Sequence, residues 1–237
     1  MTHPDAPFQE KSDRSQSART SMPVWLETIV LLVVALVLAV IIKTFFVQPF
    51  YIPSVSMEPQ FVKNDRILVE KMSYWGGGTP QRGDIVVFKD PGGWLPASED
   101  GSPTNPITKA LSYVGLYPTG GHLVKRVIGV GGDRVVCCDA KGRITVNGKA
   151  LNESSYLPKG TKPSLTKFDV HVPQDHLWVM GDNRGDSYDS RGHMGDPDRG
   201  FVAADLVVGK VFALVWPLNR FEIIHRPATF ADLPDPK

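Results

Sequence analysis

Hydrophobic and polar positions divide the chain into regions with different patterns. Residues 1–22 are polar and have no periodic apolar positions, which is typical of a disordered tail. From Val24 to Phe46 almost every residue is apolar, and a bilayer-spanning helix needs about 20 such residues. Beyond this stretch, short apolar runs are separated by turn residues, which is typical of a sheet protein. We therefore predict a cytoplasmic tail at 1–22, a transmembrane anchor at 23–46, an extracytoplasmic β domain at 47–226 and a C-terminal tail at 227–237.

Two alternatives to a membrane span are a buried core helix and a cleaved secretory signal. A core helix normally keeps a polar face, and residues 29–42 have none. A cleaved signal has a shorter apolar core that ends in small residues, whereas Lys43 is followed by Thr-Phe-Phe-Val-Gln-Pro-Phe. The pattern therefore favours an uncleaved anchor. The basic residues before the span place the tail in the cytoplasm by the positive-inside rule: Lys11, Arg14 and Arg19.

The region after the anchor predicts a mostly β fold of antiparallel sheets folded over one another. Asn147-Gly148 is a strong type I′ hairpin signal, and the absence of helix–strand alternation argues against a parallel sheet. Residues 90–121 break the pattern and are interpreted as an insertion outside the body of the domain. Seven runs predict strands: RILVEKM (66–72), GDIVVFKD (83–90), HLVKRVIGV (122–130), DRVVCC (133–138), RITVNGKAL (143–151), HLWVMGD (176–182) and LVVGKVFALVW (206–216).

Charge and cysteine content exclude several classes of protein. The formal net charge of the 237 residues is +1, which gives no support for nucleic-acid binding. The only cysteines, Cys137 and Cys138, are adjacent, so they form neither a zinc site by themselves nor a disulfide framework. Geometry disfavours a bond between neighbours, so the sequence favours two ordinary strand thiols, with a vicinal disulfide as the alternative.

Two hydroxyls stand in a stiff segment directly after the anchor. Pro53 and Pro59 bracket Ser54 and Ser56, and in an extended chain these two serines point the same way. One serine is then placed to attack a carbonyl while the other donates to the resulting oxyanion. Taken alone, the segment favours an ordinary Ser-Pro turn.

A second candidate is a lysine inside a predicted strand. In the strand around Lys125, alternation places Leu123, Lys125 and Val127 on one face. If that face is buried, desolvation lowers the lysine pKa, and a neutral amine can take a proton from a serine. The alternative is an edge-strand lysine whose stem packs while its ammonium reaches water.

The third candidate is a loop at 181–191, GDNRGDSYDSR, which is dense in Asp, Asn, Gly and Ser. We expect Arg184 and Arg191 to pair with acids of the same loop, namely Asp182, Asp186 or Asp189. A calcium loop fails on spacing, because Arg184 holds a position that requires an acid or amide. A Ser–His–Asp triad through His193 is the remaining alternative, although no Gly-x-Ser-x-Gly elbow is present.

Four segments behind an anchor, in this order, resemble the bacterial type I signal peptidases: IPSVSMEP (52–59), RGDIVVF (82–88), KRVIGVGGDRV (125–135) and GDNRGDSYDSR (181–191). The resemblance runs from about Phe46 to Leu218, without the 90–121 insertion. It implies a membrane-bound serine endopeptidase of the bacterial cell membrane, single-pass, that removes signal peptides from secretory preproteins after small residues. The activity that the resemblance implies requires no metal or cofactor.

The resemblance also implies a role for each matching residue. Ser56 is the nucleophile, Lys125 the general base, Ser54 an oxyanion donor, and Ser187 the residue that hydrogen-bonds and orients Lys125. Structural support of the site falls on Arg126, Asp182, Asn183, Asp189 and Arg191. Shallow pockets for the substrate's −1 and −3 residues fall on Ile52, Pro53, Met57 and Val124. Val55 replaces a glycine that many members have, and Gln60-Phe61 replaces a common Thr-Leu, so fine specificity is open.

Other functions compete with this one. A self-cleaving repressor-type Ser–Lys protease predicts a DNA-binding domain, and the membrane span argues against it. An anchored β scaffold would tolerate loss of Ser56 or Lys125, and both residues are present. The candidates for the part of the domain that enters the bilayer are Trp75, Trp94 and the apolar patch at 111–117.

Overall fold

The computed structural model describes residues 23–95, 105 and 121–236, and separates the chain into two compact units, residues 1–38 and 39–237. The tail at 1–22 and the patch at 111–117 lie outside the described residues. Helix α1 runs from Val24 to Ile41, and a π-helical turn at Ile42–Phe46 follows it. None of the α1 residues is buried, and α1 is the one helix in the described ranges that is long and apolar enough to cross a membrane.

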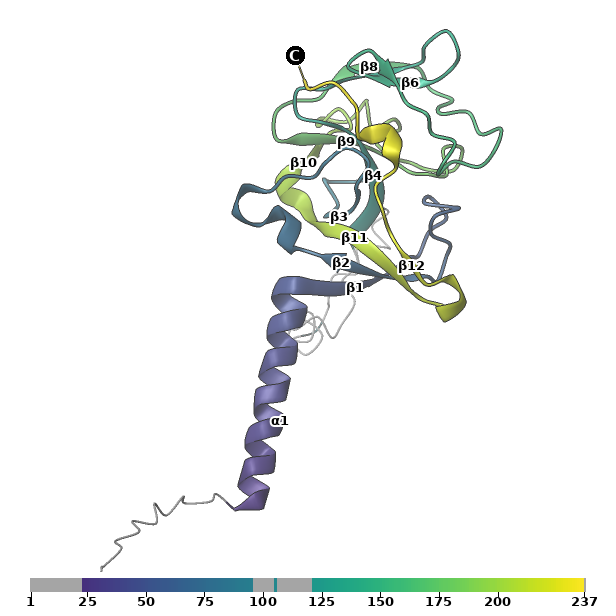
Figure 1. Cartoon of the computed structure of the whole chain (residues 1–237). Coiled ribbons are helices and arrows are strands. Elements are labelled where there is room, and N and C mark those ends of the chain that lie inside the picture. Colours follow the sequence, from purple (N-terminus) through teal and green to yellow (C-terminus); the bar gives the residue numbers. More distant parts are fainter. Residues whose placement is uncertain (1–22, 96–104, 106–120, 237) are drawn as a thin grey trace, which may run out of the picture. The chain divides into compact units, whose positions relative to one another are not determined.

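Two antiparallel sheets form the rest of the described chain (Figure 1). The larger sheet has the order β1 (Val47–Tyr51), β2 (Arg66–Glu70), β11 (Val207–Trp216), β3 (Ile85–Lys89), β4 (His122–Val130), β9 (His176–Met180) and β10 (Val202–Ala203), with β12 (Glu222–Ile223) paired to β11. The smaller sheet has the order β7 (Lys149–Ala150), β6 (Ile144–Val146), β5 (Arg134–Cys137) and β8 (Phe168–His171). Short 3₁₀ turns lie at Met72–Gly77, Ala204–Leu206, Leu218–Arg220 and Ala228–Phe230.

Apolar side chains of the two sheets pack into three clusters. The first joins the smaller sheet to β4 and β9, around Trp178 and Ile128. The second lies between β2, β3, β11 and the segment after β1, and contains Ile52, Met57 and Phe61. The third covers β3, β4 and β9 on the side of Val86 and Val127. Strand β4 contributes to all three clusters, directly or through a half-buried residue, so both of its faces are packed.

The structure confirms all seven predicted strands and the hairpin between β6 and β7. Asn147 and Gly148 have φ angles of 52° and 83°, in the left-handed region that this turn requires. Four strands were missed: β1, β8, β10 and β12. Strand β1 contains Pro49 and continues directly from the apolar stretch, which masked its pattern. The other three are two to four residues long, too short for a period to be recognised.

Two regions that were predicted to lie apart from the domain are packed against it. At the start of the 90–121 insertion, Asp90 accepts hydrogen bonds from the backbone of Gly92, Trp94 and Leu95, and Trp94 is buried. Residues 96–104 and 106–120 of that insertion lie outside the described residues. The C-terminal tail is also fixed, because Phe230 and Leu233 are buried in the first cluster.

The cysteines differ from the favoured interpretation. Cys137 and Cys138 are joined by a disulfide at the end of β5. Cys137 belongs to the first apolar cluster, and Cys138 packs against it. The expectation of two free thiols is therefore wrong for this structure, and the vicinal disulfide that geometry disfavoured is the observed state.

Candidate active site

The loop that follows β1 holds Ser56 in a buried position. Backbone hydrogen bonds fix the loop at both ends: Ile52 donates to Asp65 at 3.0 Å, and Phe61 donates to Met57 at 3.0 Å. Ser56 is 8% exposed, and its Oγ lies 3.2 Å from Oγ of Ser54, which is exposed. The two hydroxyls are therefore within hydrogen-bonding distance of each other, and their roles as nucleophile and oxyanion donor stay a prediction.

Lys125 lies on β4, which pairs with β3 on one side and with β9 on the other, so it does not stand on an edge strand. The residue is 4% exposed, and Nζ donates to Oγ of Ser56 at 2.6 Å. Burial lowers the pKa of Lys125 from 10.5 to about 8, with Asp189 opposing that effect and Arg191 adding to it. The alternative of an edge-strand lysine with a solvated ammonium is thereby excluded.

Ser56 and Lys125 meet because the larger sheet brings β1 close to β4. Three strands separate β1 from β4 in the hydrogen-bonding order, yet the rings of Phe50 and His122 lie 5.3 Å apart. Phe50 and Val124 also pack against the same apolar cluster as Ile52 and Met57. The segment after β1 thus places Ser56 beside Lys125 because both segments pack on the same apolar cluster, although β1 and β4 are not paired strands.

The loop after β9 supports this pair through buried ion pairs. Asp182 accepts two hydrogen bonds from Arg126, at 2.8 and 2.6 Å, and both side chains are at most 1% exposed. Asn183 anchors the serine loop, because its backbone N–H donates to the Ser56 carbonyl at 3.1 Å and its side chain donates to the Val55 carbonyl. These contacts join the loop after β9 to β4 and to the serine loop, and the supporting role of the three residues stays a prediction.

Asp189 and Arg191 form the second ion pair of the loop. Arg191 donates twice to Asp189, at 2.9 and 2.7 Å, and the Gly181 backbone N–H adds a third donor. Burial alone would raise the pKa of Asp189, but these donors hold it below its ordinary value. Gly181 must stay a glycine, because a Cβ there would lie 2.3 Å from the Ser56 carbonyl oxygen and 2.3 Å from Oγ of Ser187.

Ser187 differs from its predicted contact. Its hydroxyl donates to Oδ2 of Asp189 at 2.7 Å, and this carboxylate, not the Lys125 amine, is its hydrogen-bond partner in the structure. Ser187 still lies at the site, beside Gly181. With its proton directed at Asp189, the oxygen of Ser187 keeps lone pairs that can accept a hydrogen bond.

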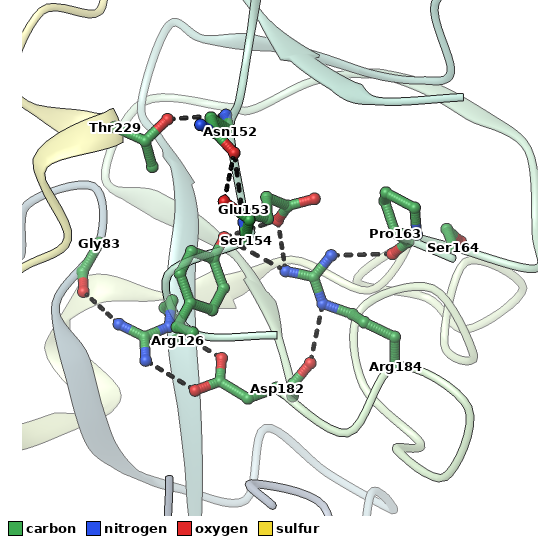
Figure 2. Close-up of polar contacts among 12 residues, drawn as sticks. Gly83, Arg126, Asn152, Glu153, Ser154, Pro163, Ser164, Asp182, Arg184 and Thr229 are labelled. Atoms are coloured by element: carbon green, nitrogen blue, oxygen red, sulfur yellow. Dashed lines mark hydrogen bonds and ion pairs between the residues drawn. The ribbon is translucent and has the colours of Figure 1, made fainter. Parts of the chain in front are cut away.

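Sequence reasoning gave Arg184 the wrong partner and missed Glu153. Arg184 donates to Oε1 of Glu153 at 2.6 Å, although 31 residues separate them, and not to an acid of its own loop (Figure 2). The same carboxylate oxygen accepts the Tyr156 hydroxyl at 2.6 Å. The guanidinium of Arg126 lies 4.4 Å from the centre of the Tyr156 ring. The segment before β8 is thus joined to the catalytic loop by a buried network of charges and one ring.

The alternative chemistries lack the required contacts. Nδ1 of His193 pairs with Asp196 at 2.7 Å, and its ring stacks on Trp94 at 4.2 Å, so its contacts do not form a triad with a serine. Asp182, the first ligand of the alternative calcium loop, is instead committed to Arg126.

The four residues predicted to bind substrate lie around the serine. Ile52 and Met57 are 2% and 1% exposed and belong to the second apolar cluster. Pro53 is exposed and Val124 half-buried, so these two keep surface for contact. The prediction of a shallow pocket at these residues remains a prediction.

A hydroxyl held against a buried amine, with a second hydroxyl beside it, defines a hydrolase of the Ser–Lys type on a β scaffold. The family model "Signal peptidase, peptidase S26" matches residues 25–216. Signal peptidase I of Mycobacterium tuberculosis is 38% identical over 250 aligned positions, which cover 93% of this chain and 84% of that protein. A probable signal peptidase I of Mycobacterium leprae is 39% identical over 82% of this chain and 77% of its own length. A crystal structure of a signal peptidase I from Enterococcus faecalis V583 shares 25% identity, covers 55% of this chain and 95% of its own, and has a TM-score of 0.34.

The chain therefore belongs to the signal peptidase I family of serine peptidases, as its four sequence segments predicted.

Proposed function

We propose that this protein cleaves signal peptides from exported preproteins by acyl transfer to Ser56, with Lys125 as the general base. Membership of the signal peptidase I family supports the substrate class. The observation that carries the mechanism is the 2.6 Å contact between Nζ of Lys125 and Oγ of Ser56 in a buried site. A pKa near 8 leaves part of the amine neutral at physiological pH, which a base requires.

In the first step, neutral Lys125 takes the hydroxyl proton of Ser56 as Oγ attacks the carbonyl carbon of the scissile bond. The tetrahedral intermediate places negative charge on the former carbonyl oxygen, where the Ser54 hydroxyl and the Ser56 N–H donate hydrogen bonds. The ammonium of Lys125 then protonates the leaving amine, and the C–N bond breaks. Lys125 next activates a water molecule, which attacks the acyl-enzyme ester, and the proton returns to Ser56 as the ester bond breaks.

Ser187 and Asp189 position the base in this proposal. Asp189 is fixed by Arg191 and by Ser187, so its charge stands at a constant distance from Lys125. The Ser187 oxygen accepts a hydrogen bond from the amine during the cycle and orients its lone pair toward Ser56. Asp182, Asn183 and Arg126 hold the backbone of the two catalytic segments.

The preference for small residues at −1 and −3 is supported by the packing near the serine. Ile52 and Met57 are buried in the second apolar cluster, whereas Pro53 is exposed and Val124 half-buried, so these two keep surface for a substrate side chain. A side chain as small as alanine fits such a site without repacking, whereas a larger one must displace core atoms. We therefore propose preproteins with Ala-x-Ala before the cleavage site as substrates.

A membrane location completes the proposal. Helix α1 is the anchor, residues 1–22 the cytoplasmic tail, and the β domain is extracytoplasmic, on the side where exported preproteins emerge. Trp75 is 48% exposed, and its ring lies 5.6 Å from the ring of Phe46. Because Phe46 is close to the anchor in the chain, Trp75 is the side chain that we propose for contact with the bilayer. Trp94 is withdrawn from that role, because it is 5% exposed.

The test is cleavage of a preprotein bearing Ala-x-Ala by the full-length enzyme in liposomes. Ser56→Ala and Lys125→Ala are expected to keep the fold and lose turnover. Lys89→Ala, at an exposed position on the neighbouring strand β3, is the matched control and should keep full activity. Turnover by Ser56→Ala at the wild-type rate, or unfolding of both site variants, would instead favour a scaffold.

A further inference from the structure

Beside the serine loop, the described part of the chain contains a pocket that none of the proposed catalytic roles uses. Its volume is about 290 Å³, and its walls are Pro59 and Gln60, residues 155–158, Arg220 and Glu222. Pro59 lies three residues after Ser56, within the turn that the Phe61 N–H closes onto the Met57 carbonyl. The pocket therefore begins where the loop of the nucleophile ends.

Strand directions give the side of the scissile bond on which this pocket lies. In the order β1, β2, β11, β3, β4 every neighbouring pair is antiparallel, so four reversals leave β1 and β4 running the same way. Phe50 on β1 contacts His122 on β4, and Ser56 and Lys125 lie farther along these same two segments. A peptide bound along both segments in their direction meets the Ser–Lys pair first and the turn at Pro59 afterwards.

The anchor determines which end of the substrate enters first. Strand β1 starts six residues after α1 ends, so its first residues are those nearest the anchor in the chain. The apolar part of a signal peptide precedes its cleavage site and shares the bilayer with that anchor. Its cleavage region therefore runs along β1 toward Ser56, and the residues beyond the scissile bond reach the pocket.

The polar groups of the pocket carry an excess of negative charge. Arg220 is paired with the buried carboxylate of Asp65 at 3.3 Å and also donates to the Gln60 carbonyl at 3.3 Å. Glu222 is exposed and accepts a hydrogen bond from the neutral side chain of Gln60 at 3.1 Å. Arg220 is thus neutralised by Asp65, and the charge of Glu222 remains to act on an occupant.

We propose that this pocket is a specificity site for the mature part of the preprotein: it binds one side chain within the first few residues after the cleavage site and favours a basic over an acidic one. The proposal rests on the proposed function, because it requires that preproteins are cleaved at Ser56. The enzyme would then select its substrates by the first residues of the mature protein as well as by the signal peptide.

The experiment measures kcat/KM of the full-length enzyme in liposomes on one Ala-x-Ala preprotein, with Lys, Gln or Asp placed singly at positions +1 to +5. We expect Lys to exceed Asp at one position or at two adjacent positions, by roughly two- to fivefold, as for an exposed charge pair. Glu222→Gln should remove that difference, and Glu222→Lys should reverse it at the same positions. The preference at −1 and −3 should be unchanged.

Asp205→Lys is the matched control, because it makes the same charge change at an exposed residue just before β11, whereas Glu222 pairs near the other end of that strand. A Lys/Asp ratio that is the same at all five positions would overturn the proposal, as would an equal effect of Asp205→Lys and Glu222→Lys. Either result would leave Ser56-dependent cleavage intact and would refute only the proposed role of the pocket. Cleavage that persists in Ser56→Ala would overturn the proposed function and this inference together.

Discussion

Replacing Lys125 with methionine is expected to abolish turnover and to stabilise the fold. Burial lowers the pKa of Lys125 from 10.5 to about 8, so the folded protein disfavours the charged amine. One pH unit corresponds to about 1.4 kcal/mol, and the difference therefore costs about 3 kcal/mol at neutral pH. Methionine fills a similar volume without a charge, but the hydrogen bond to Ser56 is lost, at a cost of about 1 kcal/mol. The expected net gain is about 2 kcal/mol in the free energy of unfolding.

The pH dependence of this gain tests its origin. In the unfolded chain Lys125 keeps its proton up to about pH 10.5, whereas in the folded protein it releases the proton near pH 8. Between these values the unfolded state binds more protons, so wild-type stability rises with pH relative to the variant. The advantage of Lys125→Met should therefore be full below pH 8 and should decrease above it. Toward pH 10.5 it should change sign, because only the lost hydrogen bond to Ser56, about 1 kcal/mol, then separates the two proteins.

The assay is urea denaturation of the full chain in detergent, followed by tryptophan fluorescence from pH 7 to 10.5. Lys89→Met on β3 is the control, because an exposed lysine should change stability by less than about 0.5 kcal/mol. A Lys125→Met variant that is less stable than wild type at pH 7 would refute the reasoning. So would a stability difference that stays constant across the pH range.

Four further predictions follow from the same contacts. Ser54→Ala should lower kcat by roughly 10²- to 10³-fold with little change in KM, as for loss of one oxyanion donor, measured on a single preprotein. The wild-type kcat/KM should fall tenfold for each pH unit below about 8, because protonated Lys125 cannot accept the serine proton; a rate that is flat from pH 5 to 8 would contradict this. Phe230→Ala should destabilise the fold by about 3–5 kcal/mol, measured by urea denaturation, which distinguishes a packed C-terminal segment from a loose tail. Glu153→Ala and Arg184→Met should each cost about 3–5 kcal/mol and the double variant less than their sum, since each single change leaves a buried charge unpaired.

Local patterns in the sequence were sufficient for most of the fold. Alternating or continuous apolar runs of five residues or more gave the long strands, because burial of one or both faces imposes a period that can be read directly. Strand β1 was hidden by Pro49 and by the apolar stretch before it, and the strands of two residues have no period. The packing of the tail depends on two side chains, Phe230 and Leu233, whose partners lie on distant elements.

The site was predictable to the extent that its residues fall in recognisable segments. Ser56 and Lys125 stand in two such segments, and the structure brings them together as expected. The contacts of Ser187 and Arg184 were not predictable from the sequence. Ser187 donates to Asp189 of its own loop, whereas Arg184 pairs with Glu153, which lies 31 residues away in the chain, and only the folded structure selects these partners. Glu153 gave no signal at all, since it stands in an irregular segment before β8 and becomes a partner only after the two sheets have packed.

The arrangement of the buried charges explains how a lysine can serve as a base here. Three buried carboxylates lie in or beside the loop at 181–191, and an unpaired one would raise the pKa of Lys125 and keep it protonated. Each has its own arginine instead: Asp182 with Arg126, Asp189 with Arg191, and Glu153 with Arg184. Asp189 and Asp182 still oppose the effect of burial on the pKa of Lys125, and Arg191 adds to it, so the surrounding charges act in opposite directions. Desolvation is then the largest influence on the pKa of Lys125. The three arginines appear purely structural, but by pairing with the carboxylates they allow burial to determine how strong a base Lys125 is.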